Sequence, residues 1–333
     1  MNAYLEFDEN AFRDKIVLLP CDDPEWSNFT KYFAQNFDNL GLKKLISTSY
    51  APDSKPPDIP YQPTLFETEN SKFDEKKTRS HGKIFILDRD RNGNNKINIE
   101  DLQWEYLDGD GDFRSDEIIR LRDEADIVVT NPPFSLFKEF FAWLIDGNKL
   151  FSVIANKNCI TFKDVFPLIK NNKVWSGREE WAGGMWFKTT KNATDFDKEI
   201  DGEKFKNVPS IWITNMDHGR RHEPIRLMTM EDNIRFTKHI NDPKWKNAYK
   251  KYDNYDAIEV PFSDAIPDGY KGVMGVPITF LDKYCPEQFS IVGWSRHNEY
   301  DMDGGYWRGG SNDATIDGVS VYRRILIKIK EKE

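Results

Sequence analysis

Apolar and polar positions alternate with two different periods along the first two thirds of the chain. Short apolar runs, which predict buried strands, lie at residues 15–20, 41–50, 125–129, 149–156 and 208–215. Aromatic residues recur at helical spacing over residues 25–37, and another amphipathic segment follows Phe134. Strands that alternate with helices favour a largely parallel sheet with helices on both faces, so the predicted fold class is α/β.

Two further strand-like runs, at residues 82–87 and 97–107, flank a turn that contains Asn92-Gly93. This pattern predicts a β-hairpin inserted at about 82–107. The turn has several oxygen ligands at the spacing of a calcium loop, but the twelfth position lacks the required glutamate and the flanks are strand-like. We therefore expect no metal site.

The pattern changes after residue 216, where charged and aromatic residues mix without clear periodicity. We place a domain boundary there, between residues 1–216 and residues 217–333. In the later part, residues 272–281 are strand-like, and residues 322–330 are expected to form a final strand that returns to the core.

The composition is that of a folded protein with a strongly hydrated surface. Hydrophobic residues make up 38% of the chain, enough for a substantial core, whereas the net charge of −9 argues against a polyanionic partner unless one face is locally basic. No run approaches the roughly 18 apolar residues of a membrane span, so no membrane partner is expected. The three widely spaced cysteines favour a reduced, cytoplasmic setting.

The stretch "TNPPF" follows the apolar run at 125–129 and precedes a helical pattern. In open α/β sheets, ligands bind beyond the carboxyl ends of strands, where this stretch is expected to lie. Asn131 offers a side-chain carbonyl and Pro132 a backbone carbonyl, while Pro133 stiffens the backbone and Phe134 offers a flat apolar face. These groups suit a planar amine with two N–H bonds.

Such a site explains methylation of an exocyclic amino group. The lone pair of adenine N6 is delocalised into the ring, and acceptors at Asn131 and Pro132 would favour a pyramidal nitrogen that can attack a methyl group. The base would stack on Phe134 after leaving the duplex. The alternative is a strand-to-helix turn in which the prolines only stiffen the chain and Phe134 is a core residue.

Two other turns are candidates for binding a cofactor. "CDDPEW" follows the first predicted strand, so residues Cys21, Asp22, Asp23 and Pro24 either contact a ligand or begin a helix, with Asp23 as its N-cap. The acidic, glycine-rich turn "DGDGDF" places Asp112 and Phe113 where they could accept from an adenine amino group and pack against its ring. A solvated loop is the alternative.

A basic and aromatic run over residues 238–255 is a candidate for binding nucleic acid. Its lysines could contact phosphates, and its aromatic residues could pack on sugars or bases. A solvated helix face is the alternative. The lysines that we assign to DNA are Lys244, Lys246, Lys250 and Lys251.

The chain resembles the EcoRI-type adenine-specific DNA methyltransferases. Six segments recur in the order found in that family: "CDDPEWSNFTKYFAQNFDNLGLKKLIS", "GDGDFRS", "ADIVVTNPPFSLFKEF", "YDNYDAI", "GVMGVPITFL" and "RILIKIK". The resemblance implies a Rossmann-like sheet that binds S-adenosyl-L-methionine, with cofactor binding and catalysis in residues 1–216 and target recognition mainly in residues 217–333. It also implies methylation of adenine N6 within a short sequence of double-stranded DNA.

By this resemblance, residues 131–134 match the catalytic motif, Cys21–Pro24 the first cofactor loop, and Asp112 and Phe113 the site of the cofactor's adenine. A cognate restriction endonuclease in the same system, without a stable complex, is a further expectation. Two alternatives remain open. One is a catalytically silent DNA-binding relative, since "LEFDENAF" does not match the family's upstream cofactor segment; the other is the same chemistry on another planar amine or amide.

Overall fold

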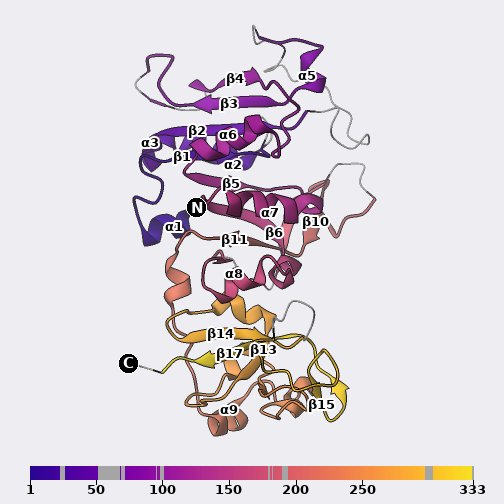
Figure 1. Ribbon diagram of the computed structural model, residues 1–333. Helices are drawn as coiled ribbons and strands as arrows, with labels where there is room; N and C mark the ends of the chain where they lie inside the picture. The colour runs from indigo at the N-terminus through magenta and orange to yellow at the C-terminus, as the bar shows by residue number, and fades with distance from the viewer. Residues whose placement is uncertain are drawn as a thin grey trace. The chain divides into compact units, whose positions relative to one another are not determined.

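The computed structural model contains two compact units, and each is described by itself (Figure 1). The first unit contains Met1–Asn156 and Trp212–Met216, and the second contains Lys157–Ile211 and Asp217–Glu333. The predicted boundary at residue 216 concerns function: it assigns cofactor binding and catalysis to residues 1–216 and target recognition to residues 217–333. This assignment stays a prediction. The structure describes residues 1–22, 27–51, 68, 72–94, 96–97, 101–178, 181, 183–189, 194–296 and 303–331.

Parallel strands form the centre of the sheet in the first unit. They are β1 (Ile16–Leu19), β2 (Lys44–Ser49), β5 (Ile127–Thr130) and β6 (Leu150–Asn156). Both β2 and β5 pair with β1 in parallel, and β6 pairs with β5 in parallel. Every residue of β1 and β5 is buried, as expected for parallel strands that are covered on both faces.

Antiparallel strands extend this sheet beyond β2. The strand β3 (Lys83–Leu87) pairs antiparallel with β2, and β4 (Gln103–Tyr106) pairs antiparallel with β3. From this edge the order runs β4-β3-β2-β1-β5-β6-β11, in which β11 is Ser210–Thr214. The predicted hairpin is confirmed, and its strands make the sheet mixed instead of largely parallel.

Helices follow the strands of the first unit as the sequence predicts. The helical pattern over residues 25–37 forms α2 and then α3, and Ser27, not the predicted Asp23, caps α2 by accepting from the backbone N–H groups of Phe29 and Thr30. Asp23 itself lies outside the described residues. The helices are α1 (Asn2–Phe7), α2 (Asn28–Gln35), α3 (Phe37–Leu40), α5 (Lys77–Ser80), α6 (Asp116–Glu124), η3 (Phe134–Leu136) and α7 (Phe137–Asp146).

The core of the first unit lies on both faces of its sheet. Val17 and Leu19 of β1 belong to a cluster with Phe33 of α2, whereas Leu18 points to the other face because side chains alternate along a strand. The helix α7 packs onto β6, where the ring of Phe141 meets that of Phe151 edge-on at 6.0 Å. Helices therefore cover the strands that carry the candidate site.

The second unit has its own four-stranded sheet with the order β12-β13-β17-β14. The final predicted strand is present as β17 (Arg324–Ile329), but it pairs antiparallel with β13 and β14 and does not join the large sheet. The reason is burial, since Ile325, Leu326 and Ile327 all pack inside the second unit. The other strands of this sheet are β12 (Ile258–Glu259), β13 (Met274–Pro277) and β14 (Phe289–Trp294).

Smaller elements complete the second unit. A three-stranded antiparallel sheet has the order β8-β10-β9, and β15 and β16 form a short antiparallel pair. The strands of these two small sheets are β8 (Met185–Lys188), β9 (Lys198–Ile200), β10 (Glu203–Val208), β15 (Thr315–Ile316) and β16 (Val319–Ser320). A further short strand, β7 (Trp175–Ser176), lies next to β11. The helices are η4 (Lys157–Thr161), α8 (Phe166–Lys170), η5 (Gly219–His222), α9 (Met230–Phe236), η6 (Pro243–Asn247), η7 (Ser263–Ala265) and η8 (Ile278–Lys283).

A buried ion pair connects β12 and β17. Arg324 Nη2 lies 2.7 Å from Glu259 Oε1, and the hydroxyl of Tyr252 donates to Glu259 Oε2 at 2.5 Å. The intervening strand β13 carries Gly275 at this level, where a Cβ would come within 2.1 Å of the Tyr252 hydroxyl. Because each partner satisfies another, the charges are tolerated inside the sheet.

No helix among the residues that the structure describes is both long enough and apolar enough to span a membrane.

Candidate active site

The stretch from Asn131 to Phe134 leaves the sheet at the carboxyl end of β5. All four residues of β5 are buried, and the chain becomes accessible at Asn131, directly after the strand. Pro133 has φ −61° and ψ 122°, the extended conformation that proline stabilises before a helix. The chain then turns through η3 into α7. The two prolines therefore hold a short extended segment between two well-packed elements.

The two acceptors of this stretch make no hydrogen bond within the described part of the chain, although Pro132 itself is buried. Asn131 is exposed, and its side chain makes no hydrogen bond to any residue that the structure describes. The carbonyl of Pro132 likewise accepts no hydrogen bond within the described part of the chain. Phe134 is 36% exposed, which is unusual for phenylalanine and argues against the alternative that it is a core residue.

The loop after β1 is bonded directly to the end of β5. The carboxylate of Asp22 accepts from the hydroxyl of Thr130 at 2.5 Å and from that of Ser27 at 2.8 Å. Its backbone carbonyl accepts from the hydroxyl of Ser47. Asp22 is buried, so these bonds replace the water that an exposed carboxylate would bind. One residue thus fixes the ends of β1, β2 and β5 and the start of α2.

Cys21 lies beside the same groups. Burial raises the pKa of its thiol strongly, the carboxylates of Asp22 and Asp112 raise it further, and a hydrogen bond with Thr130 acts in the opposite direction. The side chain therefore stays a neutral thiol at physiological pH and is not an activated nucleophile. Cys21 and Asp22 belong to the loop after β1, Asp112 to the loop before α6, and Thr130 to the end of β5. These three parts of the chain therefore meet around Cys21.

The loop that carries Asp112 packs against the end of β2. The backbone N–H of Ala51 donates to the carbonyl of Asp110 at 2.7 Å, and Gly111 has φ +84° and lies so close to Ser49 that an added Cβ would be 2.4 Å from its carbonyl oxygen. Hydrogen bonds from Arg114 keep the pKa of Asp112 below its usual value, although partial burial opposes this shift. Asp112 is therefore an ionised acceptor near Cys21.

Phe113 is buried against α7, where its ring meets those of Phe140 at 5.2 Å and Trp143 at 6.0 Å. The predicted cofactor contact of Phe113 stays a prediction, as do those of Cys21, Asp22 and Asp112. The remaining residues predicted for this site, Asp23 and Pro24, lie outside the described residues.

Three residues that the sequence did not single out are important to this arrangement. Thr130 and Ser27 bind Asp22, and Arg114 bridges Asp112 and Glu139 of α7, with Nη1 lying 2.8 Å from Glu139 Oε2. Ser27 carried a usable signal, because a serine directly before an amphipathic segment is a typical N-cap. The contact of Thr130 with Asp22 had none, since the two residues are far apart in sequence.

The family model described as "Adenine-specific methyltransferase EcoRI" matches residues 1–330. The chain belongs to this family. It is accordingly an enzyme, an adenine-specific methyltransferase of the restriction-modification type that uses a methyl donor. The silent relative that the sequence left open is thereby disfavoured.

Curated relatives match over most of their length. The chain is 39% identical to the Type II methyltransferase M.EcoRI of Escherichia coli over 332 residues, which cover 98% of this chain and 89% of the relative. It is 31% identical to the Type II methyltransferase M.MpnI of Mycoplasma pneumoniae over 334 residues, 97% of this chain and 90% of the relative. It is 32% identical to the Type II methyltransferase M.MgeORF184P of Mycoplasma genitalium over 292 residues, which cover 85% of this chain and 77% of the relative. No solved structure gave a significant match.

The lysines assigned to DNA in this family member lie in the second unit. Lys250 pairs with Asp317 at 2.9 Å, and Lys251 pairs with Asp256 at 3.2 Å. Lys244 and Lys246 belong to η6 and have no ion pair with any described residue. The contacts of all four with DNA stay a prediction.

Proposed function

We propose that this enzyme transfers a methyl group from S-adenosyl-L-methionine to N6 of an adenine in a short sequence of double-stranded DNA. The observation that supports the proposal is the segment Asn131–Phe134 at the end of β5, in which Asn131 and the ring of Phe134 are exposed and Pro132 is buried between them. Neither the Asn131 side chain nor the Pro132 carbonyl has a hydrogen-bond partner among the described residues. We infer a base-flipping step, because N6 of a paired base cannot reach acceptors at the end of a strand.

The sheet order supports a Rossmann-like arrangement of the cofactor site. From β1 the chain goes to β2 on one side, and later to β5 and β6 on the other, so the order reverses between β1 and β5. Ligands of doubly wound sheets bind at such a switch point, outside the carboxyl ends of the strands. Thr130 and Asp22 meet at this position.

The residues at this switch point fit S-adenosyl-L-methionine. In our proposal the backbone from Cys21 to Pro24 and the ionised carboxylate of Asp112 hold it, while Phe113 packs near its ring. The Asp112 side chain is 20% exposed, so a donor group of a ligand can reach it. When bound, this molecule supplies the electrophilic methyl group.

The chain's own residues would act on the adenine. Asn131 Oδ1 and the Pro132 carbonyl accept the two N6–H bonds, which draws the nitrogen lone pair out of the ring system as the new N–C bond forms. Phe134 stacks on the base and orients it, and Pro133 keeps the two acceptors at a fixed separation. As this N–C bond forms, the bond between the methyl carbon and the donor's sulfonium sulfur would break and leave a neutral thioether, and one N6 proton would then pass to water. No covalent intermediate with the protein is required, in accord with the neutral Cys21.

Substitution of Asn131 tests this mechanism. Asn131→Ala should lower the single-turnover rate of methyl transfer by about 10²–10³, because one preorganised acceptor is lost. The measurement is N6-methyladenine by mass spectrometry after incubation with S-adenosyl-L-methionine and unmethylated genomic DNA. Cofactor affinity by calorimetry should change little.

The matched control is Asn171→Ala, at an exposed asparagine directly after α8, which should keep the wild-type rate. Equal losses of rate and cofactor affinity in Asn131→Ala would contradict the assigned role. DNA binding by the wild-type chain without any N6-methyladenine would instead favour a silent relative.

The biological setting follows from the substrate. We propose that the enzyme acts in the cytoplasm, where bacterial DNA lies, and that it protects DNA from a cognate restriction endonuclease without forming a stable complex with it.

A further inference from the structure

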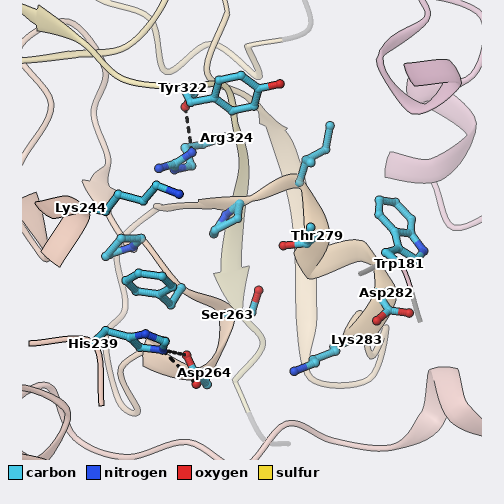
Figure 2. A pocket seen from close by; sticks show the side chains of 14 residues that line it. Trp181, His239, Lys244, Ser263, Asp264, Thr279, Asp282, Lys283, Tyr322 and Arg324 are labelled. Carbon is cyan, nitrogen blue, oxygen red and sulfur yellow. Dashed lines mark hydrogen bonds and ion pairs between the residues drawn. The ribbon is translucent and has the colours of Figure 1, made fainter. Parts of the chain in front are cut away.

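The second unit contains a pocket with a volume of about 690 Å³. It lies among η6, η7, η8 and the start of β17, with Trp181 also in its lining (Figure 2). None of the residues at the end of β5 contributes to it. A cavity of this size accommodates a drug-sized ligand or one nucleotide unit.

One wall of the pocket is aromatic. The rings of His239 and Phe262 are stacked, with centroids 3.7 Å apart and planes 6° apart. Asp264 fixes the imidazole, because His239 Nε2 lies 3.2 Å from Asp264 Oδ1, as the dashed lines of Figure 2 indicate. The result is a rigid flat surface of the kind on which a sugar or a base packs.

The charge of the pocket is positive in balance. Lys244 and Lys283 are exposed, lie on different sides of the pocket in Figure 2, and have no ion pair with any residue that the structure describes. The acidic groups are neutralised within the protein: Asp264 pairs with Lys238 at 3.1 Å, and Asp282 pairs with Arg220 at 3.0 Å.

Arg324 does not change the net charge that the pocket offers to a ligand. Arg324 also lines the pocket, but its guanidinium is bound by Glu259 inside the sheet. Two lysines without an ion pair among the described residues therefore flank an aromatic wall, in a chain whose net charge is −9. A protein of that overall charge needs a local positive site to hold a polyanion.

We propose that this pocket binds a nucleotide unit of the DNA substrate. Lys244 and Lys283 contact phosphates of one strand, and the stacked His239–Phe262 pair packs against the sugar or base between them. The inference rests on the proposed function and extends it, since it assigns DNA contacts to residues 239–283 of the second unit. Lys283, His239 and Phe262 gain roles that the sequence pattern alone did not indicate.

Salt dependence of DNA binding tests the phosphate contacts. Lys244→Gln and Lys283→Gln are compared with wild type by fluorescence anisotropy on a labelled duplex, over about 50–200 mM salt. Each variant should lower the slope of log K against log salt by about 0.9. Lys271→Gln is the matched control, because Lys271 is an exposed lysine outside the pocket, paired with Glu331, and it should keep the wild-type slope.

A second pair of variants tests the aromatic wall. Phe262→Ala should weaken DNA binding by about fivefold or more, because a packing surface is lost, and should leave the salt slope unchanged because no charge is removed. Phe236→Ala, at a 64% exposed phenylalanine outside the pocket, should have no effect on affinity. Thermal unfolding of every variant verifies that it is folded.

The outcomes separate this inference from the proposed function. Wild-type DNA binding and adenine methylation, with unchanged slopes in both pocket lysine variants, would overturn the pocket inference and leave the function intact. An unchanged affinity in folded Phe262→Ala would overturn the role of the wall. A wild-type chain that neither binds DNA nor forms N6-methyladenine would overturn the proposed function itself.

Discussion

Thr130 is the last residue of β5, and its hydroxyl donates to the buried carboxylate of Asp22. This bond joins the residue directly before Asn131 to the loop after β1. Since the proposed cofactor and base contacts lie on these two loops, the bond fixes the distance between them. We therefore expect Thr130 to be a positioning residue that acts through Asn131 and not by contact with either substrate.

Replacing Thr130 by an isosteric apolar residue tests this role. Thr130→Val should lower the methyl-transfer rate by about tenfold or more, because small displacements of reacting groups are costly. It should also lower the free energy of unfolding by about 1–3 kcal/mol, since Asp22 loses a donor while buried. Thr130→Ser keeps the hydroxyl and should restore most of the rate. A serine variant as slow as the valine variant would contradict the positioning role.

At the scale of elements, the loop between β4 and α6 depends on close backbone approach to β2. A Cβ on Gly111 would lie 2.4 Å from the carbonyl oxygen of Ser49, and its φ of +84° is unfavourable for other residues. The same loop holds Asp112 near Cys21. Loop conformation, strand pairing and the candidate cofactor site are therefore connected.

Gly111→Ala should lower the free energy of unfolding by at least about 2 kcal/mol, from backbone strain and steric overlap together. Urea denaturation provides the measurement. Gly109→Ala is the control in the same loop, because the nearest atom to its Cβ, in Glu117, is 4.0 Å away and its φ is not positive. Similar losses in the two variants would show that the close approach of Gly111 is not what stabilises the loop.

For the molecule as a whole, pH acts through a histidine between two carboxylates. His222 Nε2 lies 2.9 Å from Asp217 Oδ1, and its Nδ1 lies 2.9 Å from Glu287 Oε1. Partial burial opposes protonation, but the two carboxylates outweigh it and raise the pKa of His222 above 6.5. The folded state therefore binds this proton more tightly than the unfolded chain does.

The consequence is a loss of stability on the alkaline side. The contribution of His222 is complete below pH 6.5 and disappears as the pH rises through its raised pKa. Between pH 6.5 and pH 8, the free energy of unfolding should decrease less in His222→Gln than in wild type. The expected difference between the two proteins is about 0.2–1 kcal/mol. Urea denaturation across this range provides the test, and an identical slope in wild type and variant would contradict it.

Burial of His218 affects stability on the acidic side, opposite to His222. Desolvation lowers the pKa of His218, so its contribution is complete above pH 6.5 and is lost on the acidic side. The charge of His222 also contributes to lowering the pKa of His218, so His222→Gln is expected to alter the acidic side as well, whereas His218 is neutral above pH 6.5. The comparison between the two proteins above pH 6.5 therefore isolates His222.

Local sequence patterns were enough to predict the main elements of the first unit and the position of the candidate catalytic segment. The apolar runs that form β1, β5 and β6 are continuous, so their burial is visible without knowing their partners. The strand before Asn131 and the helix after Phe134 follow from the same local periodicity. Backbone hydrogen bonding and side-chain burial act over a few residues, and a linear pattern records them.

Contacts between distant residues became visible only in the folded chain. Asp22 and Thr130 are separated by 108 positions, and no local signal pairs their side chains. The sheet that β17 joins and the walls of the pocket were likewise set by packing between remote segments. Their physical reason is the same: burying apolar surface and satisfying buried polar groups depend on the whole chain, because the partners are chosen in space and not along the sequence.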